Sequence, residues 1–243
     1  MFRTVLVFFA VGGLTFLAGM AAIIIGIFNP YSRLIYYLGQ FWTRGILFSA
    51  GVRLDVSGKE YIDPHGTYVF AGNHQSHFDV PIVFSLLPMT VRFFTKKELF
   101  SIPVFGWAIS AVGMIKIDRS NHEKSVQTMN QAVDTIKKNN VSVVIFPEGT
   151  RSHDGQIQTF KKGGFIVAIK GGVPVVPVSI SGSLKILKKH TLRVQPGRVK
   201  VVFGKPIMTL GLTYRDRDIL IQKTRDQIAS NLDLNYNRSA DVT

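Results

Sequence analysis

The sequence predicts an α/β protein in which helices flank a central mixed sheet and a pair of membrane-anchoring helices precedes that domain. After residue 52, short runs of β-branched and aromatic residues alternate with helical segments, which is the pattern of helices packed around a sheet. Before that point the chain is apolar and contains no acidic residue. We therefore divide the chain into anchoring helices at residues 1–52 and an α/β domain at residues 53–243.

The first anchoring segment is Thr4–Phe28, a run of 25 uncharged residues. As a helix it would extend about 37 Å, which exceeds the roughly 30 Å of a bilayer's hydrocarbon core. A secretory signal peptide is the alternative, because Arg3 resembles the charged start of such a peptide. The run is longer than the roughly 7–15 apolar residues of a signal peptide, and no Ala-x-Ala site closes it.

The second anchoring segment, Tyr31–Val52, follows a helix break at Asn29–Pro30. Its aromatic residues are interspersed with Arg33 and Arg44, a mixture typical of the membrane–water interface. An ordinary helix packed on the domain is the alternative. The pair predicts membrane attachment and leaves open whether the chain crosses the bilayer or lies in one leaflet.

The α/β domain is expected to contain seven strands, several of which lack polar alternation and should be buried on both faces. They are Val52–Val56, Tyr68–Ala71, Val91–Phe94, Met114–Ile117, Val141–Phe146, Val173–Ile180 and Val199–Phe203. Helical periodicity is clearest in Glu123–Asn139 and in Tyr214–Leu232. The polar tail from Asp233 to Thr243 predicts a frayed end.

The charge of the chain points to an anionic partner. The net charge is +14, and the stretch from Gly155 to Arg215 holds eleven Lys or Arg and no acid. Nucleic acid, anionic lipid and a phosphorylated substrate all suit such a stretch. The chain has no cysteine, which excludes disulfides, thiolate metal ligands and a cysteine nucleophile.

The first constellation with chemical meaning runs from Asn73 to Asp79 between a predicted strand and an apolar segment. His74 and Asp79 can meet only if His74 lies in the loop and Asp79 falls in the first turn of the following helix. Asp79 would then fix the imidazole tautomer and leave the other nitrogen as a base. The alternatives are a helix cap at Asp79 and a metal site formed by His74, His77 and Asp79.

Two later blocks lie where predicted strands end, and the loops of α/β proteins often carry function there. In Gly113–Arg119, the fork of donors on Arg119 could hold a phosphate, and a surface ion pair with Asp118 is the alternative. In Phe146–Ser152, Arg151 would bind a phosphate while Glu148 binds hydroxyls or orients another basic residue.

Further details of the second of these blocks support a ligand site. Gly149 lets the backbone approach a ligand, and Thr150 stands between it and Arg151. Downstream, Lys162 opens a short helix whose N-terminus adds affinity for anions. A turn with a solvated ion pair is the alternative. Farther on, Pro174 and Pro177 predict an edge or irregular strand that serves as a wall.

Together these blocks resemble the glycerolipid acyltransferase family typified by 1-acylglycerol-3-phosphate acyltransferase. The marks of that family are H-x4-D, a later block ending in arginine, F-P-E-G-T-R-S and a proline-containing apolar strand. Here they are His74 to Asp79, Gly113 to Arg119, Phe146 to Ser152 and Val173 to Val178, in the same order. Residues 53–243 would then form the acyltransferase domain.

The resemblance implies transfer of an acyl group from acyl-CoA or acyl carrier protein to lysophosphatidic acid, giving phosphatidic acid. His74 would be the base and Asp79 its orienting partner. The substrate-binding residues would be Arg119, Glu148, Gly149, Thr150, Arg151 and Lys162. Glycerol 3-phosphate or another lysolipid is the alternative acceptor, and an anionic-surface or nucleic-acid binding module is the alternative to an enzyme. We expect no cofactor, no metal and no nucleic-acid partner, and a membrane-associated protein whose catalytic domain faces the cytoplasm.

Overall fold

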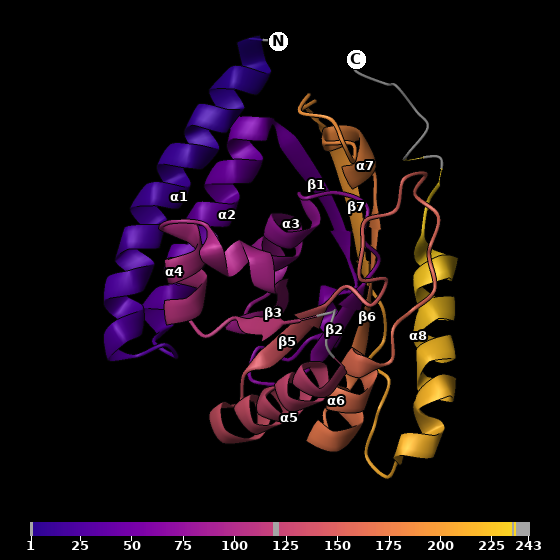
Figure 1. Cartoon of the computed structure of the whole chain (residues 1–243). Helices are drawn as coiled ribbons and strands as arrows, with labels where there is room; N and C mark the ends of the chain where they lie inside the picture. The colour runs from indigo at the N-terminus through magenta and orange to yellow at the C-terminus, as the bar shows by residue number, and fades with distance from the viewer. Residues whose placement is uncertain (1, 119–121, 235, 237–243) are drawn as a thin grey trace.

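The computed structural model describes residues 2–118, 122–234 and 236, which form a three-layer arrangement of helix, sheet and helix (Figure 1). The sheet has the strand order β1-β7-β6-β2-β5-β3-β4. Neighbouring strands are parallel except β6 and β7, which are antiparallel. The strands are β1 Val52–Ser57, β2 Val69–Gly72, β3 Val91–Lys96, β4 Ile115–Ile117, β5 Ser142–Ile145, β6 Val175–Ser181 and β7 Gly197–Phe203.

The predicted fold class is confirmed, because each of the seven expected runs forms a strand of one mixed sheet. Every residue of β2, β5 and β6 is buried, as the lack of polar alternation indicated. Side chains of these strands alternate between two cores. In β2, for example, Phe70 lies in one hydrophobic cluster while Val69 and Ala71 lie in the other.

Each core is closed by its own set of helices. The cluster around Phe70 includes residues of α2 (Arg33–Ala50) and α3 (Asp79–Leu86), and the opposite cluster includes residues of α5 (His122–Asn139), α6 (Gly163–Gly171) and α8 (Arg217–Asn231). The remaining helical segments are α1 Phe2–Phe28, α4 Phe105–Ala111, α7 Ser183–Ile186, η1 Lys59–Tyr61, η2 Lys97–Ser101 and η3 Tyr214–Asp216.

The proline-containing strand β6 lies inside the sheet, between β7 and β2, so the expectation of an edge strand is wrong. The strand is irregular where Pro177 falls. Its ladder with β7 covers Val178–Ser181 and is followed only by a single bridge between Val175 and Ile207. Pro177 lies between the ladder and the bridge, where a strand residue without an N–H donor can be accommodated. Its carbonyl oxygen accepts a hydrogen bond from Gly204 N–H.

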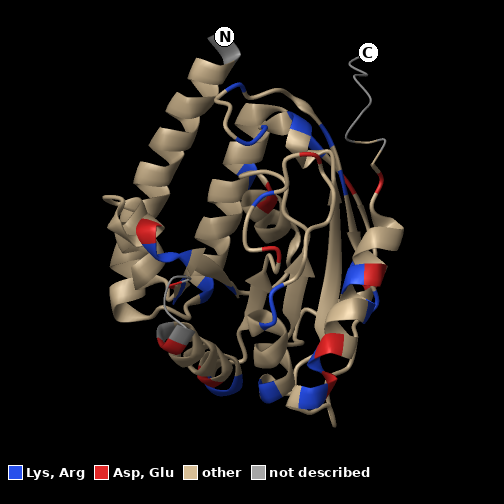
Figure 2. Cartoon of the chain, turned by 45° about the vertical axis from the view of Figure 1, so that its right-hand side comes forward, with Lys and Arg blue, Asp and Glu red and all other residues tan. Residues whose placement is uncertain are grey.

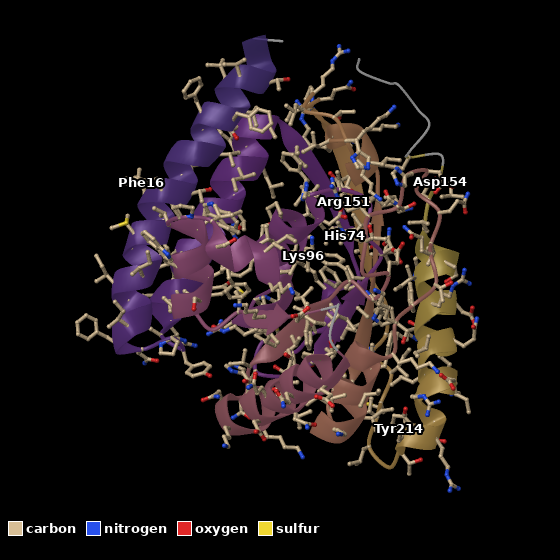
Figure 3. The ribbon with its side chains drawn as sticks, in the orientation of Figure 1. Phe16, His74, Lys96, Arg151, Asp154 and Tyr214 are labelled. Atoms are coloured by element: carbon tan, nitrogen blue, oxygen red, sulfur yellow. The ribbon has the colours of Figure 1, made fainter. Side chains whose placement is uncertain are left out.

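Helix α1 is long and apolar enough to cross a membrane by length and composition. Its Thr4–Phe28 stretch has a mean hydropathy of 2.3 and is mostly exposed, and Phe16 projects outward from it (Figure 3). No charged residue interrupts the tan surface of α1 over this stretch (Figure 2). The turn at Asn29–Pro30 separates it from α2, whose first turn is capped by the Ser32 side chain.

Helix α2 has one face on the domain and one face exposed. Gln40 Nε2 donates to the carbonyl oxygen of Phe84, and Ile46 and Leu47 join the hydrophobic core. On the other face, aromatic residues such as Phe41 and Phe48 are exposed. The packed face fits the interpretation of Tyr31–Val52 as an ordinary helix of the domain, and the exposed aromatic face fits its interpretation as an interfacial helix. The domain boundary at residue 52 stays a prediction.

Helices α1 and α4 approach each other closely at two glycines of α1. A Cβ atom added at Gly26 would lie 2.5 Å from the carbonyl oxygen of Ala111, and one at Gly19 would lie 2.9 Å from Cγ1 of Val104. A methyl group cannot be accommodated against backbone at 2.5 Å, so α4 must move if Gly26 acquires a side chain. Glycine is therefore required at Gly26 by packing.

We predict that Gly26→Ala lowers the free energy of unfolding by about 1–3 kcal/mol, the usual cost of overpacking. Gly13→Ala is the matched control, because a Cβ there meets nothing within 4 Å. Alanine favours the helix, so the control should be neutral or stabilising by up to about 1 kcal/mol. Thermal unfolding in detergent measures both, and equal shifts of Tm in the two variants would contradict the close packing.

Candidate active site

Two loops meet at the carboxyl ends of β2 and β5, and they carry most of the residues that the sequence singled out. The two strands are parallel neighbours, with Ala71 opposite Ile145. The loop after β2 holds His74 and leads into α3, while the loop after β5 holds Glu148 and Arg151. His74 and Arg151 lie in the middle of the molecule (Figure 3). This edge of a parallel arrangement is where ligands bind in α/β proteins.

The carboxylate of Asp79 organises the first loop. Its Oδ2 accepts hydrogen bonds from His74 Nδ1 at 2.7 Å, from Gln75 N–H at 2.7 Å and from Ser76 N–H at 2.8 Å. Asp79 is fully buried and is the first residue of α3, where the helix dipole also favours a negative charge. The expected geometry, with His74 in the loop and Asp79 in the first helical turn, is confirmed.

The imidazole of His74 is held between Asp79 and an aromatic ring. It stacks on Phe146 with 4.3 Å between ring centroids, and 17% of its side chain is exposed. Because Nδ1 donates to the carboxylate, Nε2 carries the lone pair of the neutral ring. The arrangement can therefore accept a proton at Nε2 and stabilise the resulting imidazolium through Asp79.

Glu148 is buried and bonded to backbone amides, and its expected role toward the substrate stays a prediction. Only 4% of the residue is exposed, Oε1 accepts from His74 N–H at 2.7 Å, and Oε2 accepts from Gln158 N–H at 3.1 Å. Burial raises the pKa of this carboxyl, and the two backbone hydrogen bonds oppose that rise. Glu148 is thus engaged with backbone amides and positions the backbone of His74.

Other bonds join the same two loops. Ser152 N–H donates to the carbonyl oxygen of His74 at 2.7 Å, and Gln75 Nε2 donates to that of Gly155 at 3.2 Å. With the Glu148 bond, they fix the H-x4-D loop against the F-P-E-G-T-R-S loop. The two motifs, some 70 residues apart in sequence, form one structural unit.

The segment Gly149-Thr150-Arg151 lies beside this unit. Gly149 has a φ of +71°, and the aliphatic part of Lys161 covers it, since a Cβ at Gly149 would lie 2.9 Å from Lys161 Cε. Partial burial lowers the pKa of the Arg151 guanidinium, while the negative charge of Asp79 raises it. Arg151 therefore stays cationic near Asp79, as a side chain that binds phosphate must.

Two lysines that were not among the predicted site residues lie near this segment. Lys161 lies against Gly149, whereas the predicted Lys162 is exposed and faces Asp218 of α8 at 3.8 Å. Lys189 Nζ donates to the carbonyl oxygen of Arg151 at 3.0 Å. The only sequence signal for Lys161 and Lys189 was the density of basic residues, because their contacts depend on how distant loops meet.

Arg119 lies outside the described residues, so its place relative to the site stays a prediction. Its neighbour Asp118 pairs with Lys97 at 2.9 Å.

His77, the third residue of the alternative metal site, is solvent-accessible. Its pKa is lowered, first because part of its ring is withdrawn from water and then because of the positive charges of Arg151 and His74. Within residues 2–118, 122–234 and 236, no three His, Cys, Asp or Glu side chains gather as a metal site would need.

Comparison with known proteins shows the family to which this fold and these paired loops belong. A family model described as Acyltransferase matches residues 53–181, more than half of the chain, and the chain belongs to this family. It is 34% identical over 211 residues to the chloroplastic 1-acyl-sn-glycerol-3-phosphate acyltransferase of Arabidopsis thaliana, covering 86% of this chain and 57% of that protein. The 1-acyl-sn-glycerol-3-phosphate acyltransferase of Saccharomyces cerevisiae is 29% identical over 232 residues, covering 95% of this chain and 76% of the yeast protein.

The chain spans less than two thirds of the length of the Arabidopsis relative and of its Brassica napus counterpart. Among solved structures, the 1-acyl-sn-glycerophosphate (LPA) acyltransferase PlsC from Thermotoga maritima has the same fold. Its TM-score is 0.81 at 23% identity, over 100% of this chain and 97% of that one. The structural likeness therefore covers α1 and α2 as well as the α/β domain.

We predict that Glu148→Gln lowers the free energy of unfolding by about 1–3 kcal/mol, because an amide NH₂ would face a backbone N–H in a buried position. Glu60→Gln is the matched control, since Glu60 is an exposed residue of η1. Denaturant unfolding measures both variants. If Glu148→Gln were as stable as the control, the assigned positioning role would be wrong.

Proposed function

We propose that this protein transfers a fatty acyl group from a thioester donor to the free hydroxyl of 1-acylglycerol 3-phosphate, giving phosphatidic acid. The observation that carries the proposal is the His74–Asp79 pair with the His74 Nε2 lone pair free to act as a base, beside a cationic Arg151. The names of the Arabidopsis and yeast relatives support the same acceptor.

In the proposed mechanism His74 Nε2 removes the proton of the acceptor hydroxyl as that oxygen attacks the thioester carbonyl. Asp79 stabilises the imidazolium that forms. The tetrahedral intermediate then collapses, the C–S bond breaks, and the imidazolium returns the proton to the departing thiolate. The products are an ester and a free thiol, and His74 is neutral again.

Direct transfer, without an acyl-enzyme, is favoured by the surroundings of His74. The chain has no cysteine. The hydroxyl of Ser76 donates to the carbonyl oxygen of Leu187, and that of Ser152 donates to Asp154 Oδ1. Both serines of the two motifs are therefore engaged away from the imidazole, and the acceptor's own hydroxyl is the nucleophile.

The acceptor phosphate is assigned to Arg151, with Gly149 and Thr150 beside it and Arg119 as a further predicted ligand. Glycerol 3-phosphate and other lysolipids share this phosphate chemistry, and acyl-CoA and acyl carrier protein share the thioester. Assays of labelled acyl-CoA and labelled acyl carrier protein with glycerol 3-phosphate and a panel of lysolipids identify the preferred donor and acceptor. Turnover of lysophosphatidic acid well above the other acceptors is the expected result.

We further propose that α1 and α2 attach the enzyme to one leaflet, with the catalytic domain facing the cytoplasm. Both ends of α1 are tied to the rest of the protein, because Thr4 Oγ1 accepts from Val194 N–H and Gly26 packs against α4. A helix held in this way suits insertion in one leaflet. The net charge of +14 suits the anionic lipids of the cytoplasmic surface.

We expect His74→Ala to lower kcat by about 10²–10⁴, the usual contribution of a positioned general base. His77→Ala, the same change three residues along at an accessible histidine, should retain most of the activity. Initial rates with lysophosphatidic acid and acyl-CoA measure the effect, and equal Tm values confirm that both variants fold. Near-normal turnover by His74→Ala would refute the mechanism.

Arg151→Ala should raise the KM for the phosphate-bearing acceptor by about tenfold or more, because a charge-assisted contact of roughly 1.5–3 kcal/mol is lost. Arg198→Ala is the control, since Arg198 lies on β7 with an exposed side chain that faces Asp55. Steady-state kinetics with each substrate varied in turn measure the change. A rise in the donor's KM alone would instead assign Arg151 to a phosphate of CoA.

A further inference from the structure

We propose that residues 99–111, which include most of η2 and all of α4 and are here named the η2–α4 segment, insert into the same membrane leaflet as α1. Trp107 would lie at the lipid interface. The inference rests on the membrane attachment proposed above and adds a second contact surface to it. The segment is uncharged, exposes apolar side chains and packs directly on α1.

The composition of the segment matches that of a lipid-contacting surface. From Leu99 to Ile115 the chain contains no charged residue. Helix α4 has only 7 residues and is about 10 Å long, so it cannot cross a hydrocarbon core of about 30 Å. An apolar segment this short suits partial insertion from one side.

The apolar side chains of the segment are exposed. Trp107 is 59% exposed, Ile102 43% and Leu99 37%. Large apolar side chains gathered on one surface mark a contact with lipid or protein rather than with water. Tryptophan is enriched where a membrane meets water, because its ring is apolar and its N–H is polar.

Close packing against α1 fixes the position of the η2–α4 segment relative to that helix. Its Val104 forms a γ-turn with φ +62° and ψ −59°, in which Phe105 N–H donates to the carbonyl oxygen of Pro103. A β-branched residue is strained at positive φ, and such strain persists only where the surroundings impose it. Here α1 supplies those surroundings, through Gly19 against Val104 and Gly26 against Ala111.

The η2–α4 segment lies beside α1. Figure 1 shows α4 against the C-terminal half of α1, on the side of the molecule away from α8. The exposed residues of α1 in this half include Leu17, Ile24 and Ile27. Both of these neighbouring elements therefore expose apolar side chains, and the lipid proposed to contact α1 is the natural partner of the η2–α4 segment as well.

Basic residues flank the segment, as expected at a lipid boundary. Lys96 and Lys97 precede it together with Glu98, which lies 3.6 Å from Lys96, and Lys116 follows the uncharged run. The Nζ atom of Lys116 lies 5.4 Å from the centroid of the Phe100 ring. Lysines in this position can keep their charge at the headgroups while their stems cover apolar surface.

A second contact would prevent the domain from swivelling about α1 and α2. The η2–α4 segment directly follows β3, which pairs with β5, and the loop after β5 carries Arg151. Insertion at both places would hold that edge of the sheet at a fixed distance from the bilayer. The lipid acceptor could then reach the site without leaving the membrane entirely.

Tryptophan fluorescence tests the proposal, because the chain has only two tryptophans. Trp42→Phe leaves Trp107 as the single reporter in the full chain. We expect its emission to shift to the blue on addition of phosphatidylcholine–phosphatidylglycerol vesicles. We also expect lipids brominated along their acyl chains to quench it, whereas matched unbrominated lipids should not.

The outcomes separate this inference from the attachment on which it rests. If the protein stays with vesicles through a high-salt wash but bromine leaves Trp107 unquenched, the η2–α4 proposal is overturned and attachment by α1 and α2 stands. If salt alone removes the protein, the attachment itself is wrong. A blue shift that depends on protein concentration and not on lipid would overturn the proposal in favour of a second copy.

A matched pair of variants provides a second test. Trp107→Ser should lower the vesicle partition coefficient several-fold at high salt. Ile219→Ser should leave it unchanged, because Ile219 is equally exposed at 58% but lies on α8, away from α1. Equal partitioning of the two variants would contradict insertion of Trp107.

Discussion

The buried carboxylate of Asp79 is the constraint on which the rest of the site depends. A charge without water must be met by hydrogen-bond donors, and here three donors converge on one oxygen atom, Oδ2. Two are backbone amides, so the charge dictates the path of the loop. The third is His74 Nδ1, so the same charge sets the orientation and tautomer of the base.

The loop is secured to the sheet on its other sides as well. Asn73 donates through Nδ2 to the carbonyl oxygen of Ile180 and accepts from the Ile180 amide, so its side chain pairs with the backbone of β6. Glu148 holds His74 N–H from the neighbouring loop. Two elements that are distant in sequence, β6 and the loop after β5, thus hold the backbone that carries His74. These bonds restrain movements that would displace the imidazole.

Helices α1 and α2 are joined to the sheet by a buried arginine as well as by apolar contacts. Arg92 of β3 is 1% exposed, and its Nη2 donates to the carbonyl oxygen of Pro30 in the turn between α1 and α2. Burial lowers the pKa of this arginine to about 10, so it remains charged at neutral pH. Its guanidinium also lies 5.4 Å from the centroid of the Tyr31 ring. Arg92 therefore fixes the turn between α1 and α2 against β3 of the sheet.

The sequence by itself determined the strands, the main helices, the long apolar helix at the start of the chain and the pairing of His74 with Asp79. These features depend on periodicity, on local turn chemistry and on residues five apart, all of which are short-range. Only the tertiary structure decided that β6 is internal, that Glu148 holds a backbone amide and that Lys161 rather than Lys162 lies against Gly149. The reason is that these outcomes depend on which distant segments meet, and the strand order and packing of the sheet set that.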